Sequence, residues 1–395
     1  MLRHRTRGGR WGVIVVSLTR GDTLYEVAPD AALQPASTMK LFTSALVLDR
    51  LGPDYQFSTD VLREGPVKPG GILDGNLVLR GDGDPSLSNK FFPGDADAPM
   101  RALAQQVSAA GVRHVTGDLV GDPSAFESQR IPTGWLSRYL TAGYAARVSA
   151  LSLNDNLVWV AVTPGVAGHA PTVALEPSSS AIQIANNVRM VSGSGGARVV
   201  IHARPDGVVE ARGWVGSRSK TRLYELVVED PALFCVGAFR DALRAQGITV
   251  DGTIRLAQTQ PTATKVTSLS SPPLARIVAA MNRESINHYA ELLFRDAVRG
   301  PDHAQIGSAD LGAALLQRFL TEKVGAGRDA VTVSDGSGLS TLDHITPRAM
   351  VQLLSYADRA PWGSAFHASL PVAGESELLR TVSYTHLTLP TILRV

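Results

Sequence analysis

The sequence predicts an α/β (α+β) protein in which one domain is interrupted by a long β-rich insertion. A strand-like pair and a helical stretch come first, and helical patterns return near residue 271. Between them, residues 56–262 contain short alternating runs such as "GNLVLRG" and "NLVWVAVTPG", separated by Gly, Pro and Asp. We therefore expect a domain formed by residues 1–57 and 263–381, with residues 58–262 as the insertion.

The first elements are a predicted β-hairpin and a helix. "WGVIVVSL" and "TLYEV" are two strand-like runs joined by a Gly-Asp turn. The basic, then apolar start resembles a signal peptide, but its apolar part is short and no small-residue cleavage site follows. We therefore favour the hairpin and expect no export signal in this sequence. The helix follows Pro35 and ends at Gly52-Pro53.

The later elements are mostly helices. Within the insertion, the clearest helical pattern is "ALFCVGAFRDALRAQGI". A strand and a loop are expected in "AVTVSDGSGLS". The remaining helices are predicted in "SPPLARIVAAMN", "HYAELLFRDAV", "SADLGAALLQRFLTEKVG" and "TPRAMVQLLSYADR".

The composition excludes several classes of protein. The 395 residues are 44% hydrophobic and carry a net charge of +2, which is too small to indicate nucleic acid or an anionic membrane as a partner. We expect no transmembrane segment, because no apolar run approaches ~18 residues. With one cysteine and no HExxH pair, we expect no intrachain disulfide, no metal and no cofactor. Cys235 lies in an apolar stretch and is predicted to be a core residue.

The first candidate for chemistry is "STMK". Ser37 and Lys40 are three positions apart, so on a helix their side chains lie on one face and can meet. Apolar neighbours predict a buried helix, and burial disfavours a charged ammonium. A neutral amine can then activate the serine hydroxyl as a nucleophile. The alternative is a chance match in which Lys40 extends to water at the edge of the helix.

The second candidate is "SIN" in "MNRESINHYAELLF", in the break between two predicted helices. Ser285 and Asn287 would project a hydroxyl and an amide from one loop, suited to proton relay and substrate binding. The alternative is that Ser285 only caps the second helix. The order Ser-x-x-Lys, then Ser-x-Asn, is the order found in serine acyltransferases that act on penicillin and D-Ala-D-Ala peptides.

With these motifs, the chain resembles the D-alanyl-D-alanine carboxypeptidase/endopeptidase family, the low-molecular-mass class C penicillin-binding proteins. The supporting stretches occur in the family's order over roughly residues 11–380. They are "PASTMKLFTSALVLDRLGPDYQF", "LVLRGDGDPSLS", "GDLVGDPSAFE", "VSALSLNDNL", "ESINHYAELLFR", "SDGSGLS…ITPRAM" and "SLPVAG". The resemblance implies a penicillin-binding/serine β-lactamase-like transpeptidase domain. Residues 58–262 occupy the place of the family's insertion, which is usually described as two subdomains.

The resemblance also implies roles for single residues. Ser37 would form the acyl-enzyme, Lys40 would activate it, and Ser285 would pass protons toward the leaving amine. Asn287 would orient the substrate and Lys40. Asp122 would meet the amino group of a diaminopimelate side chain, although a structural role in the turn Gly-Asp-Pro is the alternative.

The partners implied are peptidoglycan stem peptides and β-lactam antibiotics, with no nucleic acid. The implied activity is that of a cell-wall hydrolase in the periplasm or elsewhere outside the cytoplasm. Asp335 and Ser337 in "SDGSG" are further candidates for the cleft, and a tight turn explains the glycines equally well. Asp82 and Asp84 in "GDGDP" are interpreted as loop structure.

One family motif is missing. Lys-Thr-Gly, expected on a strand downstream of "SLPVAG", is absent, because none of the six lysines is followed by Thr-Gly. In the family this strand supplies an oxyanion donor and a cationic site for the substrate carboxylate, and losing one such donor costs ~10²–10³ in rate. We expect residues 382–395 to be a non-native tail that resembles sequencing-adapter read-through. We also expect the chain to be C-terminally truncated and its activity to be impaired.

Two other functions remain open from the sequence. One is a serine β-lactamase or esterase of the same fold, against which the long insertion argues. The other is a non-catalytic protein that binds the cell wall or traps β-lactams, against which Ser37, Lys40, Ser285 and Asn287 argue.

Overall fold

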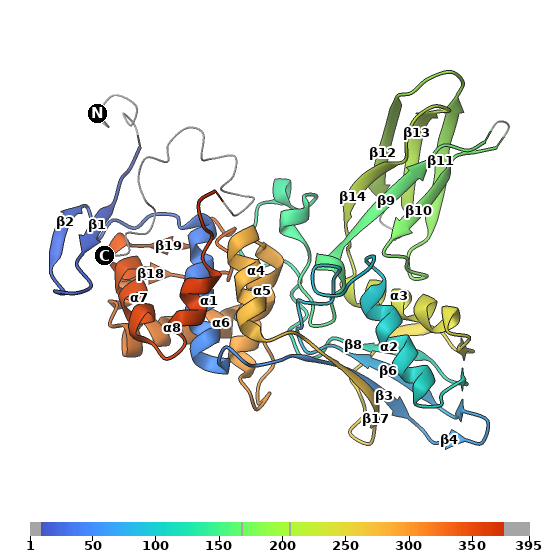
Figure 1. Cartoon of the computed structure of the whole chain (residues 1–395), viewed down its shortest axis with the longest axis horizontal. Coiled ribbons are helices and arrows are strands. Elements are labelled where there is room, and N and C mark those ends of the chain that lie inside the picture. Colours follow the sequence, from blue (N-terminus) through green and yellow to red (C-terminus); the bar gives the residue numbers. More distant parts are fainter. Residues whose placement is uncertain (1–8, 167–168, 205–206, 375–395) are drawn as a thin grey trace. The chain divides into compact units, whose positions relative to one another are not determined.

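The computed structural model describes residues 9–166, 169–204 and 207–374 of the chain. These residues form two compact units (Figure 1). Among the described residues, the first unit contains 9–55, 132–136 and 273–374, and the second contains the remainder. From the sequence, the chain was expected to return to the first domain at residue 263. That position precedes the strand Thr264–Ser270, which is hydrogen-bonded within the second unit.

The first unit is built around helix α1 (Met39–Leu51). A 3₁₀ turn, Ala36–Thr38, leads into α1, and Gly52 ends it with a φ of 83°, as Pro35 and Gly52-Pro53 predicted. Most of α1 is buried, and it packs against five other helices of the unit (Figure 1). These are α4 (Leu274–Glu284), α5 (Asn287–Arg299), α6 (Ala309–Phe319), α7 (Pro347–Arg359) and α8 (Gly363–Ser369). A residue on one face of α1 is therefore enclosed by segments from the distant end of the chain.

The strands of the first unit are short. The predicted hairpin is confirmed: β1 (Val13–Val16) and β2 (Thr23–Val27) pair antiparallel. Strands β18 (Val331–Thr332) and β19 (His344–Ile345) form a second antiparallel pair, and a single bridge joins Leu33 to Ile345. The loop between β18 and β19 contains the "SDGSG" sequence, so the strand pair fixes both ends of that loop.

The second unit contains a helix-covered sheet system. Its five-stranded sheet has the order β16-β8-β6-β3-β17, and a four-stranded sheet has the order β15-β7-β5-β4. The strands are β3 (Ser58–Glu64), β4 (Val67–Lys68), β5 (Ile72–Leu73), β6 (Asn76–Arg80), β7 (His114–Val115), β8 (Leu119–Asp122), β15 (Thr249–Val250), β16 (Ile254–Leu256) and β17 (Thr264–Ser270).

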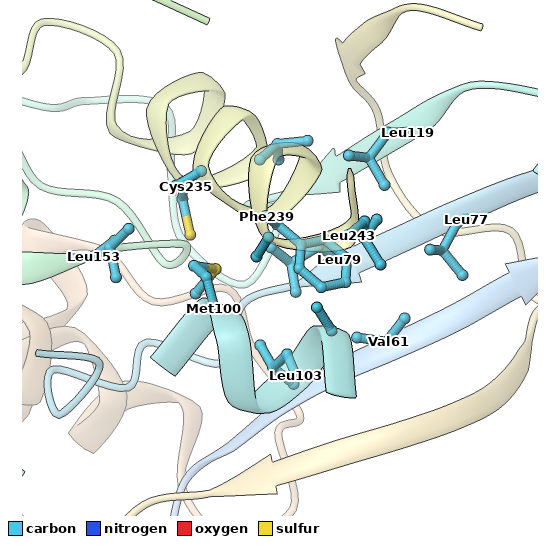
Figure 2. Close-up of a cluster of buried hydrophobic side chains, with 14 of the residues drawn as sticks. Val61, Leu77, Leu79, Met100, Leu103, Leu119, Leu153, Cys235, Phe239 and Leu243 are labelled. Atoms are coloured by element: carbon cyan, nitrogen blue, oxygen red, sulfur yellow. The ribbon is translucent and has the colours of Figure 1, made fainter. Parts of the chain in front are cut away.

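Helices α2 (Ala98–Ala109) and α3 (Pro231–Ala245) pack together over this system. Figure 2 shows their shared core, in which Met100 and Leu103 of α2 lie near Phe239 and Leu243 of α3. Cys235 is fully buried in this core, as predicted, and burial raises the pKa of its thiol. The helix α2 has no counterpart among the elements expected from the sequence.

The second unit also contains two three-stranded sheets, β10-β9-β14 and β11-β13-β12. Val162, Val188, Ala211 and Val215 from both sheets form a separate small core. The strands are β9 (Leu157–Thr163), β10 (Thr172–Glu176), β11 (Ile184–Val191), β12 (Ala197–Ala203), β13 (Val209–Gly216) and β14 (Arg222–Val227). The β-rich character expected between residues 56 and 262 is therefore present. Across the described residues of both units, no helix is long and apolar enough to cross a membrane.

Candidate active site

Ser37 lies at the solvent-facing start of the α1 segment. It occupies the middle of the 3₁₀ turn, and the preceding residue Ala36 has a positive φ of 46°. Ser37 is exposed, whereas Lys40 one turn later is only 2% exposed. The hydroxyl can therefore meet a ligand from solvent while the amine lies behind it in the protein.

The amine of Lys40 is surrounded by oxygen atoms. Its Nζ lies 3.1 Å from Ser37 Oγ, 2.6 Å from Asn287 Oδ1 and 2.9 Å from the carbonyl oxygen of Ser337. As an ammonium, Lys40 can donate one hydrogen bond to each of the three. As a neutral amine it keeps two of these bonds and can accept the hydrogen of Ser37 with its lone pair.

Burial shifts the balance toward that neutral form. Desolvation lowers the pKa of Lys40 from 10.5 to about 8, and the nearby carboxylates of Asp335 and Glu291 oppose this shift. The predicted burial of Lys40 is confirmed, and the alternative in which it extends to water is wrong, because the side chain is buried and bonded inside the protein. At pH 7 about a tenth of the molecules therefore contains an uncharged amine beside Ser37.

Ser285 connects α4 to α5 in a left-handed backbone conformation, with φ 57° and ψ 42°. It ends α4, and the N-cap position of α5 is occupied by Ile286, so the alternative role of Ser285 as N-cap of the second helix is wrong. Its Oγ donates a hydrogen bond to Ser37 Oγ at 2.8 Å. The turn in the backbone thus directs the hydroxyl at Ser37 rather than along the helix.

Asn287 is the first residue of α5, and its Oδ1 accepts the hydrogen bond from Lys40. The structure thus brings Ser37, Lys40, Ser285 and Asn287 into one connected group, although the two motifs are about 250 residues apart in the chain. Their assigned roles in catalysis remain predictions.

The loop between β18 and β19 forms another side of the site. Asp335 is fully buried, and its carboxylate accepts the backbone N–H groups of Ser337 at 3.0 Å, Gly338 at 2.6 Å and Ser340 at 2.7 Å. The indole Nε1 of Trp135 also donates to Asp335, at 2.7 Å. The carboxylate therefore holds the loop so that the carbonyl of Ser337 points at Lys40.

Gly338 allows this loop to lie against the turn that carries Ser37. Its φ is +79°, and a Cβ at this position would collide with the carbonyl oxygen of Ala36 and lie 2.9 Å from Met39 Cβ. The loop glycine is therefore required by close backbone contact as well as by the turn.

Glu291 was not among the residues predicted from the sequence. It is fully buried on α5 and accepts backbone N–H groups from the same loop. The available signal was its position four residues after Asn287, which places both on one face of a helix. Nothing in the local sequence indicates that this face meets the loop.

Asp122 lies at the end of β8 in the second unit and is buried. Its carboxylate accepts backbone N–H groups from Ser124 at 2.9 Å and Thr259 at 2.8 Å, and also the Thr259 hydroxyl. Burial by itself would raise the pKa of this carboxyl, but these bonds outweigh it and lower the pKa. The bonds are those of a structural turn residue, the alternative considered above, and contact with substrate remains a prediction.

Solved structures identify the class of fold. The chain resembles the crystal structure of penicillin binding protein 4 (dacB) from Haemophilus influenzae, with a TM-score of 0.75 and 23% identity over 92% of this chain and 78% of that one. The same protein complexed with a novel β-lactam gives a TM-score of 0.69 at 22% identity, with the same coverage. The α/β penicillin-binding/serine β-lactamase-like fold is therefore confirmed.

Sequence relatives then define the family. The D-Ala-D-Ala carboxypeptidase 3 (S13) family matches residues 2–388, and the chain belongs to this family of enzymes. A D-alanyl-D-alanine carboxypeptidase of Actinomadura sp. (strain R39) is 33% identical over 93% of this chain and 68% of that protein. The D-alanyl-D-alanine carboxypeptidase DacB of Haemophilus influenzae is 24% identical over 93% and 75%.

These matches confirm the resemblance predicted from the motifs. The family match extends past residue 381, where the native sequence was expected to end. Residues 382–395 lie outside the described part of the structure, so their foreign origin remains a prediction.

Proposed function

We propose that this protein is a serine-type D-Ala-D-Ala carboxypeptidase/endopeptidase that acts on peptidoglycan stem peptides through an acyl-enzyme on Ser37. The observation that carries the proposal is the position of Ser37 Oγ, 3.1 Å from the amine of Lys40 and 2.8 Å from the hydroxyl of Ser285. A hydroxyl between a base of low pKa and a second hydroxyl is suited to attack a carbonyl and to exchange protons.

In the first step, neutral Lys40 accepts the proton of Ser37, and Ser37 Oγ forms a bond to the carbonyl carbon of the penultimate D-alanine. When the resulting tetrahedral intermediate breaks down, the C–N bond to the last D-alanine is cleaved. The proton held on Lys40 passes through Ser285 to the leaving amine. Water then attacks the ester, with Lys40 again as base, and restores the Ser37 hydroxyl.

β-Lactams resemble the terminal dipeptide, and we expect them to acylate the same serine when the lactam C–N bond opens. Activity on the cell wall places the protein outside the cytoplasm, in the cell envelope or periplasm. In this proposal the first unit is the D,D-peptidase domain, residues 58–262 are the inserted subdomains, and Asp122 is the weakest candidate for substrate binding.

The test is covalent labelling with a fluorescent penicillin, followed by digestion and mass spectrometry. We expect the adduct on the peptide that contains Ser37, and no adduct in Ser37→Ala. Ser44→Ala is the matched control, because Ser44 is also a serine on α1 but is buried and bonded to the Lys40 carbonyl. An adduct on another residue, or unchanged labelling of Ser37→Ala, would contradict the assignment.

A second candidate function, left open by the sequence, is that of a β-lactam-trapping protein. Release of D-alanine from a muramyl-pentapeptide-like substrate separates the two. A labelled serine without any release of D-alanine favours the trap, and rapid release of hydrolysed penicillin favours a β-lactamase. Cleavage of cross-linked dimers compared with pentapeptides distinguishes endopeptidase from carboxypeptidase.

A further inference from the structure

A second polar group lies directly behind the proposed site. Asn287, Glu291 and Arg295 are four residues apart on α5, so they follow one face of the helix. Glu291 and Arg295 are both fully buried, and Arg295 Nη1 lies 3.0 Å from Glu291 Oε2. A buried ion pair carries a large desolvation cost, so its presence next to the site requires an explanation.

The other carboxylate oxygen of Glu291 contacts the loop that faces Lys40. Oε1 accepts the backbone N–H of Gly336 at 3.1 Å and that of Ser337 at 3.0 Å. The carbonyl of Ser337 in turn accepts the hydrogen bond from Lys40. The two bonds to Glu291 fix the peptide planes that end at Gly336 and Ser337. The next plane contains the Ser337 carbonyl together with the Gly338 N–H, which Asp335 binds. Glu291 therefore positions that carbonyl through the loop backbone, one peptide away.

Glu291 also contributes charge to the site. Burial lowers the pKa of Lys40, and the carboxylates of Asp335 and Glu291 partly restore it. Burial, and then Asp335, raise the pKa of Glu291 itself to about 7, while Arg295 and Ser337 oppose that rise.

Two other ionisable groups near Glu291 and Arg295 keep the same protonation state at neutral pH. Burial, and then Asp335, raise the pKa of Asp343, which keeps that carboxyl protonated. Burial, and then Arg295, lower the pKa of His288 to about 3, so His288 is neutral.

We propose that Glu291 is a positioning residue for acyl transfer: it holds the Asp335–Gly338 loop, with the carbonyl that binds Lys40, and supplies negative charge beside that lysine. The inference rests on the proposed role of Lys40 as the base for Ser37. Glu291 acts through the loop and through its charge, and we assign it no contact with substrate.

Three variants of the full chain distinguish the effect of the length of the Glu291 side chain from the effect of its charge. Glu291→Gln keeps an oxygen acceptor of similar length and removes the charge. Glu291→Asp keeps the charge and shortens the side chain, so the carboxylate no longer reaches both loop N–H groups. Asp296→Asn is the matched control, because Asp296 forms another buried ion pair on α5, with Arg299 at 3.3 Å.

Two measurements are made on each variant. NMR of ¹³C-labelled lysine follows the titration of Lys40, whose signal is identified by its loss in Lys40→Met, and only six lysines are present. Stopped-flow fluorescence then gives the rate of acylation by a fluorescent penicillin as a function of pH. The NMR titration does not require the protein to be acylated.

We expect Glu291→Gln to lower the pKa of Lys40 by on the order of one pH unit, because an ammonium loses stabilisation when a nearby negative charge is removed. The acid limb of the rate profile should move to lower pH in its upper part, above about pH 7, where Glu291 of the wild type is mostly ionised. We expect Glu291→Asp to retain the Lys40 titration but to lower the maximal acylation rate by about 10-fold to 10²-fold, because the loop is released. Asp296→Asn should leave both unchanged.

The inference is overturned if Glu291→Gln titrates like the wild type, if Glu291→Asp acylates at the wild-type rate, or if Asp296→Asn produces the same changes. If Glu291→Gln does not melt cooperatively, the Glu291→Asp result decides. A wild type that is not labelled on Ser37, combined with a shifted Lys40 titration in Glu291→Gln, would contradict the proposed function and leave the influence of Glu291 on Lys40 in place.

Discussion

The rate at which Ser37 is acylated should depend on pH through Lys40. Burial lowers the pKa of this lysine from 10.5 to about 8. At pH 7 the neutral fraction of the amine is then about 9%, compared with about 0.03% for a lysine of unperturbed pKa. The site therefore increases the neutral fraction of this amine about 300-fold at neutral pH, as the net effect of burial and of the opposing carboxylates.

The direction of this pH dependence follows from the protonation of Lys40. Below the pKa the amine is protonated and cannot accept the proton of Ser37, so the rate falls as the pH is lowered. We expect the logarithm of the acylation rate to rise by about one per pH unit between pH 6 and 7.5, and to level off above about pH 8. Stopped-flow mixing with a fluorescent penicillin measures this profile, with a reaction without protein as the control for hydrolysis of the antibiotic.

Lys40→Arg is the informative variant, because a guanidinium stays protonated over this range. We expect its acylation rate to be lower by at least ~10²-fold, with no rise near pH 8. A wild-type rate that is constant from pH 6 to 9, or that still rises with full slope at pH 10, would refute a neutral Lys40 as the base.

Three further outcomes are expected. Ser285→Ala removes the hydroxyl 2.8 Å from Ser37 Oγ and should lower release of D-alanine by ~10²–10⁴-fold, and a wild-type rate would exclude proton transfer through Ser285. Gly338→Ala should reduce both acylation and the melting temperature, because its Cβ meets the Ala36 carbonyl. Gly325→Ala is the control, because Gly325 has the same φ of +79° but lies in open space, so its stability should fall only by the backbone strain of about 1–2 kcal/mol. Equal losses of stability in the two variants would contradict the contact with Ala36. Replacing residues 382–395 with a family segment that carries Lys-Thr-Gly should raise release of D-alanine by at least ~10²-fold, and equal activity before and after would show that the present tail is native.

Local signals in the sequence were sufficient to predict the elements around the site. Pro35 and Gly52 mark the ends of the α1 segment. Proline favours the start of a helix and glycine favours its end, and both preferences are independent of the surrounding packing. The hairpin β1–β2 was likewise predicted from two apolar runs and a turn. The spacing of Ser37 and Lys40 predicted their contact, since residues three apart on a helical segment are neighbours.

Interactions between residues that are distant in the chain were harder to predict from the sequence. Strand β17 pairs with β3, about 200 residues earlier, and this pairing keeps residues 264–270 in the second unit. A single sequence contains no local signal for such a partner. The segment 132–136 groups with the first unit for the same reason: its Trp135 donates a hydrogen bond to Asp335, 200 residues away.

The four side chains proposed for catalysis could be named from the sequence, because a serine, a lysine, a second serine and an asparagine occur in a recognisable order. Their protonation and orientation depend on the fold. Lys40 is buried because five helices enclose α1, and burial lowers its pKa. Ser285 points at Ser37 because its backbone is left-handed, and Glu291 reaches the Ser337 loop because α5 packs beside it. Desolvation and the direction of a hydrogen bond depend on atoms brought together from distant parts of the chain, and only the folded protein contains that arrangement.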